Sequence, residues 1–150
     1  MSLGKLNKSK VQGLESTRRA VESLHRLTLV RHAKSDLGLP GQQDWDRVLN
    51  RRGQQDAPEM ARRLRSRRHK PDLILSSPAA RALTTATVMA RELKVPATIL
   101  RQDERLYLAS PADVLAVIHE HGGTAKHVMV FSHNPGLTEC ANRLSAGEHI

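Results

Sequence analysis

The apolar run Leu27-Thr28-Leu29-Val30 is followed directly by the pair Arg31-His32. Such a short apolar run predicts a β-strand. The strand would carry a guanidinium and an imidazole at its carboxyl end. In open α/β sheets, ligands bind outside the carboxyl ends of the strands. Arg31 and His32 are therefore candidates for a binding site.

A second stretch of the chain repeats this pattern. The run Val128-Met129-Val130-Phe131 ends at Ser132-His133. Two strands that each bring a histidine to the same edge of a sheet indicate a site for a phosphate group.

The remaining segments alternate between strand and helix patterns. We predict strands over residues 27–30, 72–75, 97–100 and 127–131, and helices over 50–68, 78–93, 111–122 and from residue 134 onward. This alternation is typical of a mostly parallel sheet with helices on both faces. The predicted fold is a three-layer α/β/α sandwich.

Capping residues set the expected starts of two helices. Asn50 is placed as the N-cap of the helix over 50–68, and Ser77 as the cap of the next helix, with Pro78 at its first position. Pro58 must either kink the first of these helices or start its regular part. The residues expected on the buried side of that helix are Ala57, Met60, Ala61 and Leu64.

Composition limits the classes of protein and partner. A chain of 150 residues is expected to form one domain with its own core. Its formal net charge of +9 favours anionic partners. Trp45, Tyr107 and Phe131 are its only aromatic residues, too few for a surface that stacks nucleic-acid bases. We therefore do not expect nucleic acid as the main ligand.

Cysteine content and the amino terminus bear on location. Cys140 is the only cysteine, so no intrachain disulfide is possible and a cytoplasmic location is expected. The sequence has neither an apolar stretch long enough to span a membrane nor a secretory signal, and no membrane partner is expected. Residues 1–24 are expected to form a flexible or partly helical extension before a domain over 25–150, because Leu14, Val21 and Leu24 could lie on one helical face. A targeting peptide is the other interpretation, which Glu15 and Glu22 weaken.

Phosphoryl transfer requires a nucleophile and fixed positive charge around the phosphoryl oxygens. Histidine can form a covalent intermediate, and the attacking ring must be neutral. Arg31 disfavours protonation of His32 and can bind phosphate in a bidentate manner. Arg81 falls in the first turn of a predicted helix, where the helix terminus also favours anions. His133 stands at the end of a strand, just before another helix start.

Three motifs now support a family resemblance. Leu29-Val30-Arg31-His32-Ala33-Lys34-Ser35, Ser76-Ser77-Pro78-Ala79-Ala80-Arg81-Ala82 and Phe131-Ser132-His133-Asn134 resemble those of the histidine phosphatase superfamily, which has a phosphoglycerate-mutase-like fold. The short chain without a large insert is similar to the small SixA-type phosphohistidine phosphatase branch. The resemblance spans Leu27 to Leu144.

The resemblance implies roles for particular residues. His32 would be phosphorylated, while Arg31, Arg81 and His133 would form the phosphate pocket, with His133 also counted as catalytic. Glu104 lies where the superfamily often has its proton donor, although Asp36 or Glu139 could serve instead. The superfamily needs no metal or other cofactor.

The chain departs from the family pattern at two places. Ala33 stands where the family usually has glycine, which keeps a small residue beside the nucleophile. The chain also ends at Ile150, soon after the last predicted helix, whereas family members generally continue into a further strand. Either the sequence is truncated, or the domain over 25–150 has an incomplete edge to its sheet.

Other groups of basic residues have simpler interpretations. The basic run over residues 62–70 is expected to be a solvated helix face. His119 and His121 are two positions apart in a predicted helix and so face different directions, which does not favour a metal site.

The functional hypothesis is a metal-independent phosphatase that hydrolyses a phosphomonoester or phosphohistidine through a covalent intermediate on His32. Imidazole needs less help from an acid than an alkoxide does, because histidine titrates near ~6.5. Without an inserted domain, the site would be open to a side chain from another protein. The expected partner is a phosphorylated small molecule or a phosphohistidine-bearing protein. The alternative is a catalytically weak module that binds phosphate or nucleic acid with the same pocket.

Overall fold

The computed structural model describes residues 26–147. The predicted extension over residues 1–24 therefore lies outside the described residues. None of the helices between residues 26 and 147 is long and apolar enough to cross a membrane.

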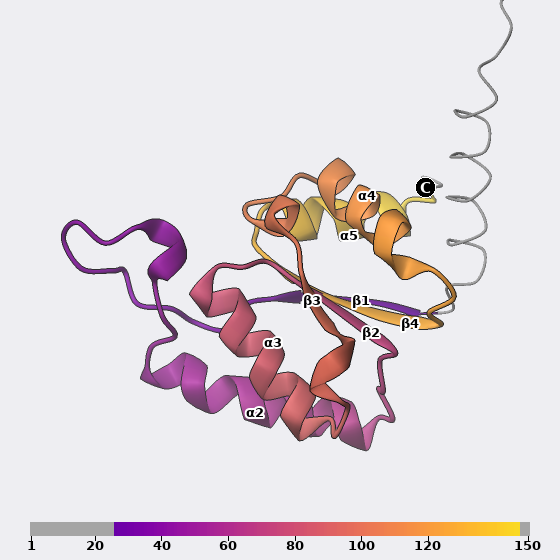
Figure 1. The fold of residues 1–150 in the computed structure, drawn as a ribbon, viewed down its shortest axis with the longest axis horizontal. Helices are drawn as coiled ribbons and strands as arrows, with labels where there is room; N and C mark the ends of the chain where they lie inside the picture. Colours follow the sequence, from indigo (N-terminus) through magenta and orange to yellow (C-terminus); the bar gives the residue numbers. More distant parts are fainter. Residues whose placement is uncertain (1–25, 148–150) are drawn as a thin grey trace, which may run out of the picture.

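The described residues form three layers, as predicted (Figure 1). The four strands are β1 (Arg26–Arg31), β2 (Leu73–Ser76), β3 (Leu100–Gln102) and β4 (His127–Ser132), all parallel and in the order β1-β4-β2-β3. The four α-helices are α2 (Arg51–Ser66), α3 (Ala80–Glu92), α4 (Pro111–Gly122) and α5 (Gly136–Ser145). Helices α2 and α3 cover one face of the sheet, and α4 and α5 cover the other.

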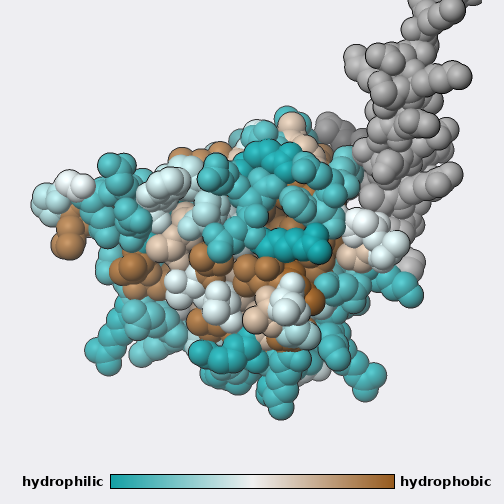
Figure 2. All heavy atoms as spheres, in the orientation of Figure 1, coloured by the Kyte–Doolittle hydropathy of each residue, from teal (hydrophilic) through white to brown (hydrophobic). Residues whose placement is uncertain are grey.

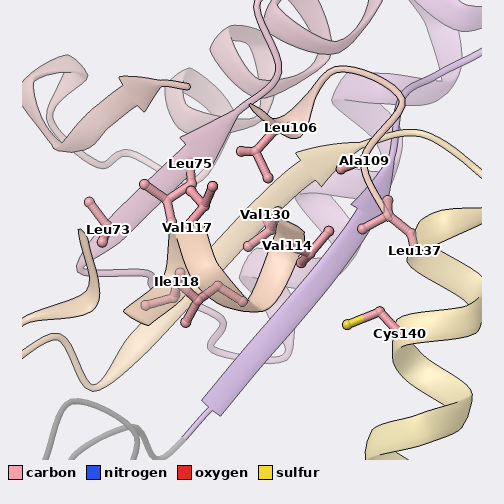
Figure 3. Packing of buried hydrophobic residues seen from close by; sticks show 11 residues of the cluster. Leu73, Leu75, Leu106, Ala109, Val114, Val117, Ile118, Val130, Leu137 and Cys140 are labelled. Atoms are coloured by element: carbon pink, nitrogen blue, oxygen red, sulfur yellow. The ribbon is translucent and has the colours of Figure 1, made fainter. Parts of the chain in front are cut away.

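Each face of the sheet has its own apolar core. Strand β4 is buried along its whole length, and its side chains alternate between the two faces. Val130 packs with Val114 of α4 and Leu137 of α5 (Figure 3). Val128 belongs to the same core. Met129 and Phe131 belong to the core beneath α2 and α3.

The strand register brings three strand ends together. Arg31 pairs with Ser132 at the end of β1, and Ser76 pairs with Phe131 at the end of β2. The amide of His32 donates to the carbonyl of Ser132 at 3.3 Å, and the amide of Ser77 donates to that of Phe131 at 2.9 Å. The residues that follow β1, β2 and β4 therefore lie side by side at one edge of the sheet.

The first capping prediction is confirmed and the second is wrong. The side chain of Asn50 accepts the amide of Gly53 at 2.9 Å at the start of α2, which continues through Pro58. Helix α3 begins only at Ala80, after the N-cap Ala79. The hydroxyl oxygen of Ser77 accepts the amide of Ala79 within a turn instead.

Two smaller predictions also need correction. Residues Ala97–Ile99 form a 3₁₀ turn, η2, in which the amide of Ile99 donates to the carbonyl of Pro96, so β3 starts only at Leu100. Met60 is 47% exposed, because the buried stripe of α2 is narrow and consists of Gly53, Ala57 and Ala61.

Candidate active site

An open cavity of about 690 Å³ lies at the carboxyl ends of β1, β2 and β4. All four residues predicted for a phosphate pocket line it: Arg31, His32, Arg81 and His133. The other lining residues are Lys34, Ser35, Asp44, Arg47, Arg52, Asp56, Leu108 and Asn134. A second hollow, of about 440 Å³, runs between β1 and α2 and is lined mainly by aliphatic surface, with Asp56, Glu59 and Arg63 among its residues. It contains neither of the two histidines predicted for the site.

His32 is the first residue after β1 and is held in one orientation. Its Nδ1 lies 2.7 Å from the carbonyl oxygen of Ala33, so Nδ1 carries the proton of the neutral ring and donates it. The lone pair is thereby left on Nε2. Burial and the charges of Arg81 and Arg31 lower the pKa of His32 below its usual value.

Arg81, in the first turn of α3, is 3% exposed. Its Nε donates to Nε2 of His32 at 3.3 Å, which confirms that Nε2 is the acceptor. Its two terminal nitrogens both bind Asp44: Nη1 donates to the backbone oxygen at 2.7 Å and Nη2 to the carboxylate at 2.9 Å. A fixed guanidinium thus lies against the reactive nitrogen of a neutral imidazole.

His133 follows β4 and is 2% exposed. Its ring lies 5.3 Å from that of His32, measured between centroids. Burial, followed by the charges of Arg81 and His32, lowers its pKa to about 4, so the ring is neutral at pH 7.

Ser77 determines which nitrogen of His133 is available. The Ser77 hydroxyl lies 2.8 Å from Nε2 of His133, and its oxygen also accepts the amide of Ala79. Because its proton has no other acceptor among the described residues, we assign that proton to the bond with Nε2. The proton of the neutral ring is then on Nδ1. That atom is buried and has no hydrogen-bond partner among the described residues, which leaves a donor for an oxyanion.

Three residues of the site, namely Asp44, Arg47 and Tyr107, are not predicted from the sequence. The carboxylate of Asp44 accepts hydrogen bonds from Tyr107, Arg47 and Arg81. The Tyr107 hydroxyl, Arg47 and Arg81 hold the pKa of this carboxyl well below its usual range. Asp44 and Arg47 belong to a polar loop without periodicity, and no pattern in that loop points to Arg81.

The candidate proton donors lie elsewhere. Glu104 is exposed on a 3₁₀ turn, η3 (Glu104–Leu106), and does not line the cavity. Asp36 and Glu139 do not line it either. The carboxylates that do are Asp44 and Asp56. The role of Glu104 therefore stays a prediction.

His119, His121 and His127 have separate surroundings. His121 contacts Asp103, His127 contacts Thr28, and Nε2 of His119 is buried without a partner in the described part of the chain. Within residues 26–147, no cluster of three or more histidine, cysteine or acidic residues could hold a metal ion.

Comparisons with known proteins agree with this geometry. The family description of the histidine phosphatase superfamily (branch 1) matches residues 27–106. The sequence has no match among curated proteins.

Three solved structures show the same fold. The putative phosphohistidine phosphatase SixA from Agrobacterium tumefaciens is 33% identical, with a TM-score of 0.74, and the match covers 83% of this chain and 79% of that one. The protein histidine phosphatase SixA complexed with tungstate is 22% identical, with a TM-score of 0.70 and coverage of 79% and 75%. A putative phosphohistidine phosphatase SixA from Nakamurella multipartitia is 23% identical, with a TM-score of 0.65 and coverage of 82% and 70%.

Proposed function

Because the chain belongs to the histidine phosphatase superfamily, we propose that it hydrolyses phosphohistidine, without a metal ion, through a covalent intermediate on His32. The observation that carries this proposal is the orientation of His32. Its unprotonated Nε2 faces Arg81 at 3.3 Å in a cavity lined by further cationic side chains.

The first chemical step forms a bond between Nε2 of His32 and phosphorus and breaks the bond from phosphorus to the leaving group. The Nε–H of Arg81, which points at the Nε2 lone pair, transfers its hydrogen bond to a phosphoryl oxygen and so frees that lone pair for attack. Arg31 and Arg81 neutralise the phosphoryl oxygens, and Nδ1–H of His133 donates to one of them.

In the second step, water attacks phosphorus and releases inorganic phosphate, and His32 recovers its lone pair. The low pKa of His32 favours the neutral ring in both the free and the regenerated enzyme. Catalysis at neutral pH therefore requires no separate base to activate the nucleophile.

The leaving group favours phosphohistidine over an alkyl phosphate. An imidazole leaving group is protonated near neutral pH, since histidine titrates near ~6.5, whereas an alkoxide needs a strong acid beside it. Asp44 stays ionised because its pKa is held low, and Glu104 does not line the cavity. For phosphomonoesters, we propose Glu104 as the proton donor.

We also propose that the protein works in the cytoplasm.

The test compares phosphohistidine with p-nitrophenyl phosphate, each with and without a chelator. We expect His32→Ala to lower turnover of phosphohistidine by at least ~10³-fold. His119→Ala, the same change outside the cavity, serves as the control. A rapid quench with labelled substrate should trap phosphate on wild-type protein and not on His32→Ala.

Three results would reject the proposal. Unchanged turnover in His32→Ala would exclude the nucleophile, and loss of activity with chelator would exclude the metal-independent reaction. Wild-type protein that turns over neither substrate but binds RNA tightly and in a salt-sensitive manner would support the binding-module alternative.

A further inference from the structure

The loop between β1 and α2 extends away from the sheet (Figure 1). Two of its residues, Asp44 and Arg47, line the cavity. Leu37 and Leu39 of this loop are exposed, and Figure 2 shows apolar atoms at its tip. A 3₁₀ turn, η1 (Asp44–Asp46), lies on the return of the loop. From this turn the carboxylate of Asp44, itself 43% exposed, extends to the buried side chain of Arg81.

Asp44 occupies both terminal nitrogens of the arginine on which phosphate binding depends. Nη1 of Arg81 is 2.7 Å from its backbone oxygen, and Nη2 is 2.9 Å from its carboxylate. The remaining nitrogen, Nε, faces His32. In the free protein, all three nitrogens of Arg81 therefore already have an acceptor within the chain.

We propose that Asp44 exchanges with the phosphoryl group for Arg81 and thereby sets how tightly the site holds inorganic phosphate. This inference rests on the proposed function, since it assigns Asp44 to the phosphate pocket of that reaction. A phosphoryl group on Nε2 of His32 would contact the same guanidinium of Arg81 that Asp44 binds. The phosphoryl group and the Asp44 carboxylate are both anions, so they repel each other at this one cation.

The charge balance of the cavity supports a role for such an opposing carboxylate. Five cationic side chains line it, namely Arg31, Lys34, Arg47, Arg52 and Arg81, against the carboxylates of Asp44 and Asp56. A pocket with this excess of positive charge would retain its dianionic product. The negative charge of Asp44, bound directly to Arg81, weakens that retention and favours release of phosphate.

The surroundings of Asp44 make the exchange possible at low cost. When Arg81 turns to phosphate, the carboxylate keeps the hydroxyl of Tyr107 and the guanidinium of Arg47, which is 2.9 Å away. The ring of Tyr107 is itself packed edge-on against Trp45 and His133. The Asp44 carboxylate therefore keeps two hydrogen-bond donors after the exchange, and these two donors hold it in place.

The experiment measures the dissociation constant of inorganic phosphate, and of tungstate as a second oxyanion, by calorimetry at pH 7. We expect Asp44→Asn to bind both about tenfold more tightly, because a unit charge several ångströms from the anion is removed at a partly exposed site. Asp44→Glu keeps the charge and should stay within about twofold of the wild type.

Asp46→Asn is the matched control. It removes the same charge from the same 3₁₀ turn, but its side chain does not line the cavity. We expect it to change phosphate affinity by less than about twofold, because solvent screens exposed charges. Thermal unfolding of each variant establishes that the loop change leaves the fold intact.

Unchanged or weaker phosphate binding by folded Asp44→Asn would overturn the inference. An equal gain in affinity in Asp46→Asn would overturn it as well, since the effect would then belong to net charge rather than to the contact with Arg81. Binding of phosphate needs no turnover, so a protein that failed the phosphatase test could still pass this one.

Discussion

Replacing Gly53 by alanine should damage the active site from outside the cavity. Gly53 lies in the first turn of α2, packed on the backbone of Lys34. A Cβ at this position would lie 2.1 Å from the Lys34 carbonyl oxygen and 2.9 Å from its nitrogen. Real Cβ atoms essentially never come within 3.0 Å of such an atom, and ordinary contact begins at 3.4 Å, so one of the two segments must move by roughly 1 Å or more.

The Lys34 segment cannot move alone. The amide of Asn50 donates to the same carbonyl oxygen at 3.0 Å, and the amide of Ala33 donates to Thr85 of α3, also at 3.0 Å. A displacement of Lys34 is therefore transmitted to His32, two residues before it. Misplacing a reacting group by about 1 Å can cost about 100-fold in rate, and we expect kcat/KM to fall by that order.

The change in stability is a difference between two effects. Overpacking costs about 1–3 kcal/mol, and alanine in a helix gains about 1 kcal/mol over glycine. The expected net loss is about 1 kcal/mol, or ~4 °C in Tm.

The assay pairs kcat/KM for phosphohistidine with the Tm. Gly122→Ala is the control, because Gly122 is also helical but a Cβ there would meet nothing within 4 Å. It should leave activity unchanged and stability equal or slightly higher. A Gly53→Ala protein with wild-type Tm and kcat/KM would refute the reasoning.

Two further predictions concern stability. Asn50→Ala removes the cap that accepts the amide of Gly53, and we expect it to lower the free energy of unfolding by about 1 kcal/mol in urea denaturation. The control is Asn142→Ala on the exposed face of α5, which should leave the free energy of unfolding unchanged. Equal effects of the two changes would contradict the capping role. The pKa of His133 is about 4 in the folded protein, against about 6.5 unfolded, so the unfolded chain binds more protons between these values. The free energy of unfolding should therefore decrease as pH falls from 6.5 to 4, by about 3 kcal/mol from this group alone. Urea titrations of wild type and His133→Asn should show a shallower pH slope in the variant, and parallel slopes would contradict the assignment.

The parts of the site that sequence predicts are those joined to regular elements. His32 and His133 directly follow strands, and Arg81 lies in the first turn of a helix, so periodicity together with the rule for parallel sheets places all three at one edge. Asp44 and Tyr107 are 63 residues apart and meet only through the folded loop, which no periodic pattern describes. Ser77 was assigned to the wrong partner, because a serine before a proline has the local signature of a helix cap. Its bond to His133 spans 56 residues and depends on the strand order.

The strand order also bears on how the site is assembled. Strand β4, which comes last along the described residues, lies between β1 and β2, so β1 and β2 are not neighbours in the native sheet. The amide of His32 donates to Ser132, which follows directly from the pairing of β1 with β4. Arg81 lines the cavity together with His133, which follows β4. Without β4, the sheet does not hold the end of β1, with Arg31 and His32, beside the segment that carries Arg81. The reactive centre is therefore complete only when β4 holds its place in the middle of the sheet.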